Sequence, residues 1–488
     1  VMSKGIGFVG RVNYSFAGKY LASVSVRRDG SSRLADGNQW DTFPAFSLGW
    51  RISDEGFMSS LRDSWLDNLK LRVGYGVTGT AAIDPYASFS SFEPGMIILG
   101  NGLANSTNFT QNIANIDLTW EKSKSWNFGI DASVLKNRIE LTADYYRTNT
   151  EGVIYSRMIP VNNGAFNATT QYTTNVNVCQ TLNNGIELAL TARPFIERHP
   201  GDFSWTINGT FTANHEKITK LMTPEQEYIT NGTDGKVYYK GHPVNSFYHY
   251  KLLGAWKTSE AEDAAVFNCQ PGDLKVFVPD MIHDGPGKYS RWEDVEGDNG
   301  VVERKLVHYD ADNKYDIGAN DYQVLGHNSP DWTMGLKNTF TYKNFDLSFY
   351  LYWRFGQTIK YDMLGSYDPT AGSNFPTYFD YWTEETGDEY HYFPGLNNTR
   401  ELTTYTGYYA LSFVDGSFFK VKNITLGYTL PENLMKRAGI SKLRVYTTLT
   451  NPLVIAKSNL LKDYDPEMNG SLNYPLTKQF VFGVNLSF

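Results

Sequence analysis

Residues 332–355 read WTMGLKNTFTYKNFDLSFYLYWRF, and this stretch decides the fold of the chain. In residues 345–355 every second residue is apolar, and the residues between are mostly polar or aromatic. Residues 332–342 alternate in the same way, with Asn338 as the exception. Because successive side chains of a strand point to opposite faces, the segment predicts two strands joined by a tight turn at 343–345. Each strand has an apolar face and a more polar one.

The same alternation recurs along most of the chain, which predicts an all-β fold. It is found in residues 46–50, 69–73, 125–134, 139–146, 186–190, 203–207, 443–447 and 480–488. The composition agrees, because 15% of the residues are aromatic and 43 are glycine, which suits strands and turns.

The apolar faces and the connections favour an antiparallel transmembrane β-barrel over a soluble sandwich. Five or six apolar positions in one strand match the roughly 9–11 residues of a tilted membrane strand. Tight turns at 17–19, 135–138 and 343–345 contrast with long connections at about 79–118, 220–330 and 360–414. Short turns at one rim and long extracellular loops at the other are typical of outer-membrane barrels. The apolar face then meets lipid and the polar face lines a lumen.

Counting strands back from the C-terminus gives about thirteen membrane strands, if 220–330 is one extracellular excursion that includes the strand-like segment 245–256. Single-chain bacterial barrels have an even number of strands, and an unpaired edge in lipid leaves backbone groups unsatisfied. We therefore expect residues 1–488 to be the C-terminal portion of a larger barrel.

Several long stretches resemble one family, the SusC/RagA type of TonB-dependent outer-membrane transporter. They are SVRRDGSSR (25–33), FPAFSLGWRIS (43–53), LKLRVGYGVTG (69–79), LTWEKSKSWNFGID (118–131), LKNRIELTADYYRTNT (135–150), NTFTYKNFDLSFYLYWRFG (338–356) and FFKVKNITLGYTLP (418–431). The resemblance implies a 22-stranded barrel with a plug, of which this chain would hold the last thirteen strands and not the plug.

The resemblance also implies partners and a function. The partners are a SusD-like surface lipoprotein acting as a lid, the TonB complex reached through an upstream segment, and a second transporter–lid pair in a dimer. The implied function is active import of an oligomeric nutrient across the outer membrane of a Gram-negative bacterium. An oligosaccharide is the leading substrate and an oligopeptide the alternative. A passive porin or a surface adhesin is the alternative of another class.

The residues themselves point to binding rather than to catalysis. The eight histidines show no HExxH-type spacing, no Gly-x-Ser-x-Gly elbow occurs, and we predict neither an enzyme nor a cofactor. A net charge of −8 gives no reason to expect nucleic acid. Flat aromatic side chains can stack on sugar rings, so the predicted ligand-binding residues are aromatic ones of the long connections: Tyr86, Phe89, Phe92, Tyr381, Trp382 and Tyr392. Packing of these side chains within the loops or against the lid is the competing interpretation.

The sequence also contains one weak candidate metal site and one possible disulfide. Residues 310–321 resemble a calcium loop of the family, with Asp310, Asp312 and Asp321 as candidate ligands. Lys314 and Tyr315 replace the acidic residue and the glycine that such a loop needs, so we expect no metal there. Cys179 and Cys269 both fall on the outer side in this topology, where disulfides persist. They either form a bridge or are two unrelated thiols.

Overall fold

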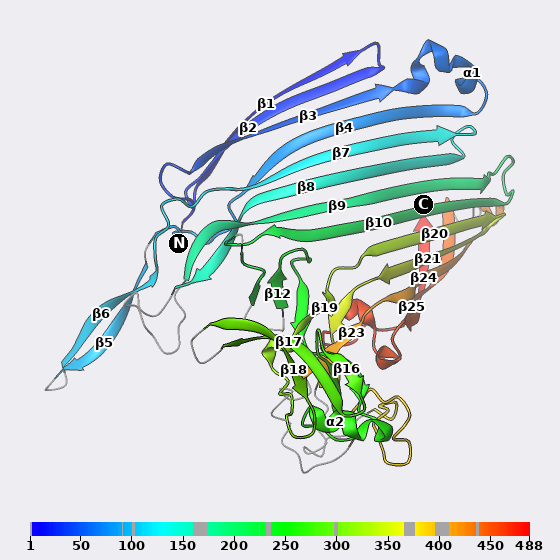
Figure 1. Cartoon of the computed structure of the whole chain (residues 1–488). Helices are drawn as coiled ribbons and strands as arrows, with labels where there is room; N and C mark the ends of the chain where they lie inside the picture. The colour runs from blue at the N-terminus through cyan, green and yellow to red at the C-terminus, as the bar shows by residue number, and fades with distance from the viewer. Residues whose placement is uncertain are drawn as a thin grey trace.

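The structure, a computed structural model, describes residues 2–89, 91–99, 103–159, 173–223, 225–230, 236–296, 301–365, 376–395, 409–435 and 439–488. A curved antiparallel sheet dominates it, in which each strand pairs with the next one along this path (Figure 1). The strands are β1 (Gly5–Phe16), β2 (Tyr20–Ser31), β3 (Trp40–Arg51), β4 (Leu66–Thr80), β7 (Glu121–Val134), β8 (Ile139–Met158), β9 (Thr173–Phe195), β10 (Ser204–Lys220), β20 (Trp332–Tyr342), β21 (Phe345–Phe355), β24 (Phe418–Thr429), β25 (Lys442–Ala456) and β26 (Gln479–Ser487).

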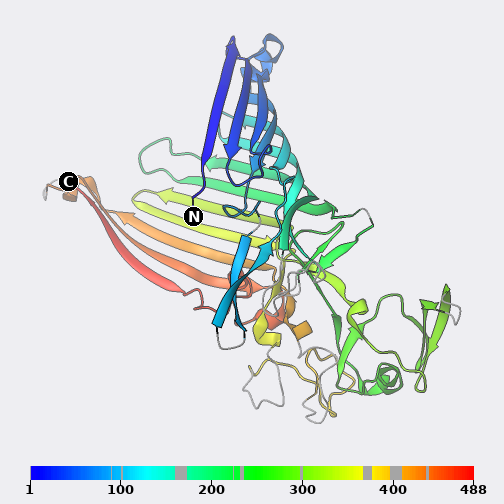
Figure 2. The same cartoon turned by 90° about the vertical axis from the view of Figure 1, so that its left-hand side faces the viewer.

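This path contains thirteen strands, which confirms the predicted number. The sheet is open, and Figure 2 shows β1 and β26 at its two edges. Among the described strands, β1 pairs with β2 alone and β26 with β25 alone. Segment 245–256 lies outside this sheet, as predicted, and β10 pairs directly with β20 across the long excursion.

The predicted alternation sets the two faces of the sheet. In the β20–β21 pair Phe340 lies opposite Leu347 and Leu336 opposite Leu351, so apolar side chains gather on one face. That face continues to both edges, where Phe8 is 65% exposed and Phe480 is 71% exposed. A soluble protein rarely exposes an apolar surface of this extent, so this is the lipid-contacting face.

Tight turns join the strands at one end of the sheet. Ala17 and Gly18 have positive φ angles of 52° and 68° between β1 and β2, and Leu135 to Asn137 have φ near 60° between β7 and β8. The long connections leave from the other end, toward the bottom of Figure 1. The end that carries the tight turns also carries the short helix α1 (Ser59–Arg62).

The long connections contain strands and helices of their own. The hairpin of β5 (Ser91–Leu99) and β6 (Leu103–Asn112) projects beyond the main sheet (Figure 1). The excursion between β10 and β20 holds β11 (Tyr228–Thr230), β12 (Lys236–Tyr239), β13 (Ser246–His249), β14 (Lys251–Ala255), α2 (Ala261–Val266), β15 (Leu274–Phe277), β16 (Ile282–Gly285), β17 (Lys288–Glu296), β18 (Val302–Tyr309) and β19 (Gln323–His327). Later connections hold β22 (Thr358–Lys360), α3 (Asp362–Gly365), β23 (Phe413–Asp415) and α4 (Glu432–Met435). Among the described residues, no helix is long and apolar enough to span a membrane.

Buried apolar clusters lie mainly in the connections, and they separate the two cysteines. Cys179 on β9 packs with Ile218 and Leu221, next to Ile229 of β11 and Tyr238 of β12. Cys269 follows α2, belongs to the cluster around Trp256, and its Sγ lies 3.3 Å from the carbonyl oxygen of Phe267. Both residues are described, and no disulfide joins them. Of the two alternatives left open by the sequence, the structure has two separate thiols, because Cys179 and Cys269 are buried in different clusters.

Candidate functional site

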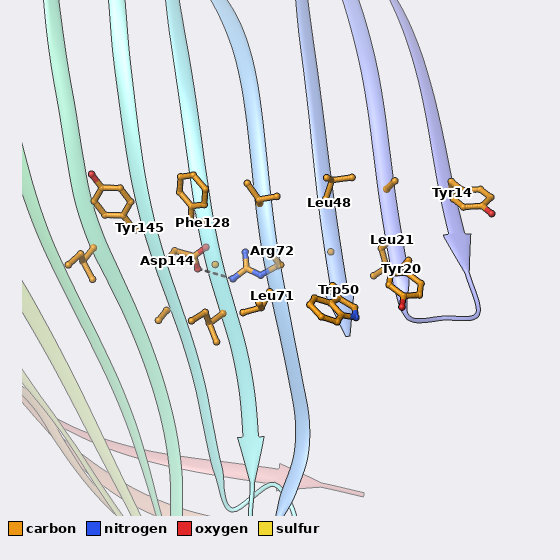
Figure 3. A pocket seen from close by; sticks show the side chains of 17 residues that line it. Tyr14, Tyr20, Leu21, Leu48, Trp50, Leu71, Arg72, Phe128, Asp144 and Tyr145 are labelled. Carbon is orange, nitrogen blue, oxygen red and sulfur yellow. Dashed lines mark hydrogen bonds and ion pairs between the residues drawn. The ribbon is translucent and has the colours of Figure 1, made fainter. Parts of the chain in front are cut away.

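The polar face of the sheet is cross-linked by arginine side chains. Arg72 on β4 donates from Nε to Asp131 Oδ2 at 2.9 Å and from Nη2 to Asp144 Oδ2 at 3.0 Å (Figure 3). It reaches Asp144 across Gly129 of β7, where a Cβ atom would lie 2.5 Å from Arg72 Cζ. The absence of a side chain at Gly129 is therefore what lets one arginine join three strands.

The same arrangement recurs near the other edge of the sheet. Arg444 on β25 donates to Asp346 on β21 from Nε at 2.8 Å and from Nη2 at 2.5 Å. It crosses Gly427 of β24, where a Cβ atom would lie 2.4 Å from Arg444 Nη2. These charged groups belong to the face opposite the lipid-contacting one, so the polar face can line a water-filled lumen.

A shallow hollow on strands β1 to β9 does not qualify as a ligand site. Most of the residues around it point to the lipid-contacting face, among them Tyr14, Leu48 and Phe128 (Figure 3). Arg72 and Asp144 also border it, but they belong to the polar face, because each lies between two outward-facing neighbours in its strand. The hollow is part of the surface that meets lipid.

A cavity of about 380 Å³ lies where two long connections meet. Its walls come from residues 250–252, Leu325 of β19, residues 356–358, Tyr392, Ala410 and residues 413–415. This volume is within the range of small-molecule sites, which are usually apolar with a few placed polar groups. The lining has that mixed character, with aromatic rings beside an amide, a hydroxyl, a carboxylate and the ammonium group of Lys251.

Gln357 is the most deeply buried polar side chain of this cavity, at 1% exposure. Its Nε2 donates to the carbonyl oxygen of Gly416 at 2.7 Å. Its Oε1 accepts no hydrogen bond from any residue that the structure describes. Buried amide oxygens normally have a donor, so this oxygen is an unsatisfied acceptor among the described residues.

An aromatic cluster supports one wall of the cavity. The ring centroid of His249 lies 5.3 Å from that of Tyr250 and 5.7 Å from that of Phe413, and both of these neighbours line the cavity. On its other side His249 stacks on Tyr322 at 4.8 Å. Burial lowers the pKa of His249 to about 4, so the imidazole is neutral at physiological pH. The wall is therefore uncharged and closely packed.

Some of the predicted ligand-binding aromatic residues are exposed, and others are packed within the connections. Tyr86 and Phe89 are exposed, with ring centroids 6.5 Å apart in the connection that leads to β5. The side chain of Phe92 lies outside the described part of the structure. Tyr381 is 40% exposed, whereas Trp382 packs against Gly272 and donates from Nε1 to Gly387 O at 3.2 Å. Tyr392 lines the cavity and donates its hydroxyl hydrogen to Leu411 O at 2.9 Å.

Two of the three candidate calcium ligands, Asp310 and Asp321, are engaged by other groups of the protein. Asp310 accepts the backbone N–H groups of Asp312 and Asn313, each at 2.9 Å. Asp321 is 1% exposed and pairs with Arg291 at 3.1 Å. Within the described residues, no group of three or more His, Cys, Asp and Glu side chains is arranged to hold a metal.

Comparison with known proteins decides the family. Residues 3–259, more than half of the chain, match the family model described as TonB dependent receptor-like, beta-barrel. The chain belongs to this family. TonB-dependent receptors are a family of transporters rather than of enzymes, and this one is an outer-membrane protein of a Gram-negative bacterium.

Relatives of this TonB-dependent receptor support the SusC/RagA assignment. The chain is 30% identical over 494 residues to the TonB-dependent receptor SusC of Bacteroides thetaiotaomicron, and 26% identical over 502 residues to the TonB-dependent receptor P3 of Formosa agariphila. These matches cover 99% of this chain and 44% and 45% of the two relatives, so the chain spans about half of their length. The structure of the RagAB peptide transporter has the same fold, with a TM-score of 0.77 at 23% identity over 100% of this chain and 48% of that one. The predicted SusC/RagA-type resemblance is confirmed.

Residues of the cavity other than Tyr392 escaped prediction. Gln357, Tyr250 and Phe413 come from three separate segments, and none of them lies in a recognisable motif. The aromatic content of the long connections was the only signal in the sequence, and it does not select these positions.

Proposed function

We propose that the whole protein imports an oligosaccharide across the outer membrane in a TonB-dependent manner. One observation carries the proposal: a cavity with polar and aromatic lining lies in the long connections of a sheet whose other surfaces suit lipid and a lumen. Aromatic rings and neutral hydrogen-bonding groups together suit sugar units. A polar face with cross-linked charges suits the passage of a hydrated solute.

The proposal includes the partners of such a system. A SusD-like surface lipoprotein would act as a lid over the long connections, the TonB complex would supply energy from the periplasmic side, and two transporter–lid pairs would form a dimer. Relatedness to SusC supports the lid and the dependence on TonB. Residues that structure the long connections, such as Trp382, would shape the surface that the lid meets.

Oligopeptides are the second candidate substrate. They are supported by the fold shared with the RagAB peptide transporter, and aromatic loops also suit peptide side chains. A passive porin or an adhesin is the candidate of another class, and neither would need TonB.

Uptake into cells separates these functions. Labelled neutral oligosaccharides and labelled peptides of similar mass are supplied to the parent strain, to a deletion strain and to a strain without TonB. Oligosaccharide uptake that requires both this protein and TonB is expected. Uptake of peptides alone would favour the second substrate, and uptake that persists without TonB would overturn active import.

A further inference from the structure

Residues 310–321 resemble a calcium loop, but the carboxylate at the end of this loop already has a cation of the protein as its partner. Asp321 is 1% exposed, and its Oδ1 atom lies 3.1 Å from Nη1 of Arg291. The same oxygen accepts the hydroxyl hydrogen of Tyr315 at 2.8 Å, and Oδ2 accepts the N–H of Gly318 at 2.9 Å. Both carboxylate oxygens therefore have donors from this chain itself.

Tyr315 and the guanidinium group fill the space beside this carboxylate. A calcium loop needs a glycine for its sharp turn at the position of Tyr315. Here the Tyr315 side chain is buried, with its ring centroid 5.1 Å from that of Tyr309 and 6.0 Å from that of Phe267. Its hydroxyl oxygen accepts a hydrogen bond from Arg291 Nη1, and Arg291 Cζ lies 5.6 Å from the centre of the ring. Tyr315 therefore belongs to the packed core of the excursion rather than to a metal-binding turn.

The charges of the loop are compensated by groups of the protein. A buried carboxylate is costly unless a cation and hydrogen bonds compensate it. Arg291 supplies the cation for Asp321, because a guanidinium group keeps its proton in proteins. Asp316 accepts a hydrogen bond from Nδ2 of Asn268 at 2.8 Å, and Asp310 accepts two backbone N–H groups. The calcium loop that the resemblance suggests therefore does not fit the residues of this chain.

Arg291 joins two parts of the excursion between β10 and β20. It lies in the middle of β17, which pairs with β16 and β18. Asp321 ends the short helical turn that leads into β19, and the next residue, Tyr322, stacks on His249 at 4.8 Å. β19 in turn pairs with β13. The pair of Arg291 and Asp321 thus holds the sheet of β16, β17 and β18 to the segment that enters β19.

We propose that Arg291 takes the place of a metal ion in this loop. The guanidinium group is the internal cation around which residues 315–321 fold, and it makes the structure of this part of the excursion independent of calcium. The inference goes beyond the proposed function, because it concerns how the long connections are ordered and applies to any imported substrate.

Hydrogen exchange of the purified intact protein in detergent tests this role, measured by mass spectrometry on peptides from residues 315–327. The parent protein is compared in excess EGTA and in millimolar calcium chloride. Arg291→Met removes the positive charge at similar length, and Asp321→Asn removes the negative charge at nearly constant size. Arg304→Met is the matched control, because Arg304 is an exposed arginine of β18 in the same sheet. Since the measurement is local, calcium bound elsewhere on the protein does not affect it.

We expect the parent protein to exchange equally fast in EGTA and in calcium. Arg291→Met should speed exchange in residues 315–327 by about 100-fold or more, because removing one partner leaves a buried charge uncompensated. Asp321→Asn should also speed it, whereas Arg304→Met should leave it unchanged. Arg291→Met combined with Asp321→Leu should exchange more slowly than Arg291→Met alone, because no unpaired carboxylate then stays buried.

Two results would overturn the inference. Slower exchange of the parent protein in calcium than in EGTA would show that a metal ion holds the loop. Exchange in Arg291→Met that is no faster than in Arg304→Met would show that the loop does not need the guanidinium group. The first comparison requires no variant, so it decides the question if Arg291→Met fails to assemble.

Discussion

Replacing Gly427 by alanine is expected to break the bridge between Arg444 and Asp346 and to destabilise the sheet. The new Cβ atom would lie 2.4 Å from Arg444 Nη2 and 2.5 Å from Asp346 Oδ1, so the bridge must move. Its two side chains are 20% and 30% exposed. Hydrogen bonds to charged groups contribute about 1.5–3 kcal/mol each, and partly exposed ion pairs less than about 1 kcal/mol. The expected loss in the free energy of unfolding is therefore about 1–3 kcal/mol.

Urea-induced unfolding of the intact protein in lipid vesicles, followed by tryptophan fluorescence, measures this loss. Gly74→Ala is the control on the same polar face, because its Cβ would meet Phe46 O at an ordinary 3.7 Å. Gly129→Ala should behave like Gly427→Ala, since it displaces Arg72. Adding Asp346→Ala to Gly427→Ala should cost little more, because the bridge is already lost. Equal unfolding midpoints for the parent, Gly427→Ala and Gly74→Ala would refute the reasoning.

Three further predictions concern the two faces and the long connections. Phe349→Arg should impair assembly, since a midplane arginine on the lipid face costs roughly 2–4 kcal/mol, whereas Ser348→Arg on the polar face should assemble normally. Equal amounts of the two variants in isolated outer membranes would contradict the assigned faces. Lowering the pH from 6.5 to 4 should destabilise the region around His249 by about 3 kcal/mol, because the histidine of the unfolded chain binds a proton that the buried histidine resists. Hydrogen exchange, corrected for intrinsic rates, should show this pH dependence in the parent protein and not in His249→Phe. Lys420→Met should destabilise the 457–478 connection by about 3–5 kcal/mol, because Asp465 and Glu467, the partners of this fully buried lysine, lose their counter-charge. Unchanged resistance of that connection to proteases would contradict this prediction.

The alternation of side chains was enough to predict the sheet. A strand has a period of two residues, so residues 345–355 reveal both their conformation and their two faces without reference to the rest of the chain. Each membrane strand pairs with the next one in the path, and for this reason counting strands along the sequence gave the observed thirteen. The exclusion of 245–256 from the sheet followed from the same count.

The candidate site could be predicted only in outline. Aromatic residues in the long connections were visible as composition, and Tyr392 among them lines the cavity. The connections have no repeating pattern, so nothing in the sequence showed that Gln357 would meet Tyr250 and Phe413. The sequence left the state of the two cysteines open for the same reason, because membership of one compartment does not show whether Cys179 and Cys269 meet, and in the structure they do not.

The sequence by itself determined the strands, their order and the face that each side chain occupies, because these depend on local periodicity and on pairing between neighbours. Only the tertiary structure decided which side chains meet across the strands and within the connections. Arg72 reaches Asp144 because the register places Gly129 between them, and a shift of one residue would turn that glycine to the other face. The cavity depends in the same way on contacts between segments far apart in the chain, and those contacts follow from packing in three dimensions rather than from any local pattern.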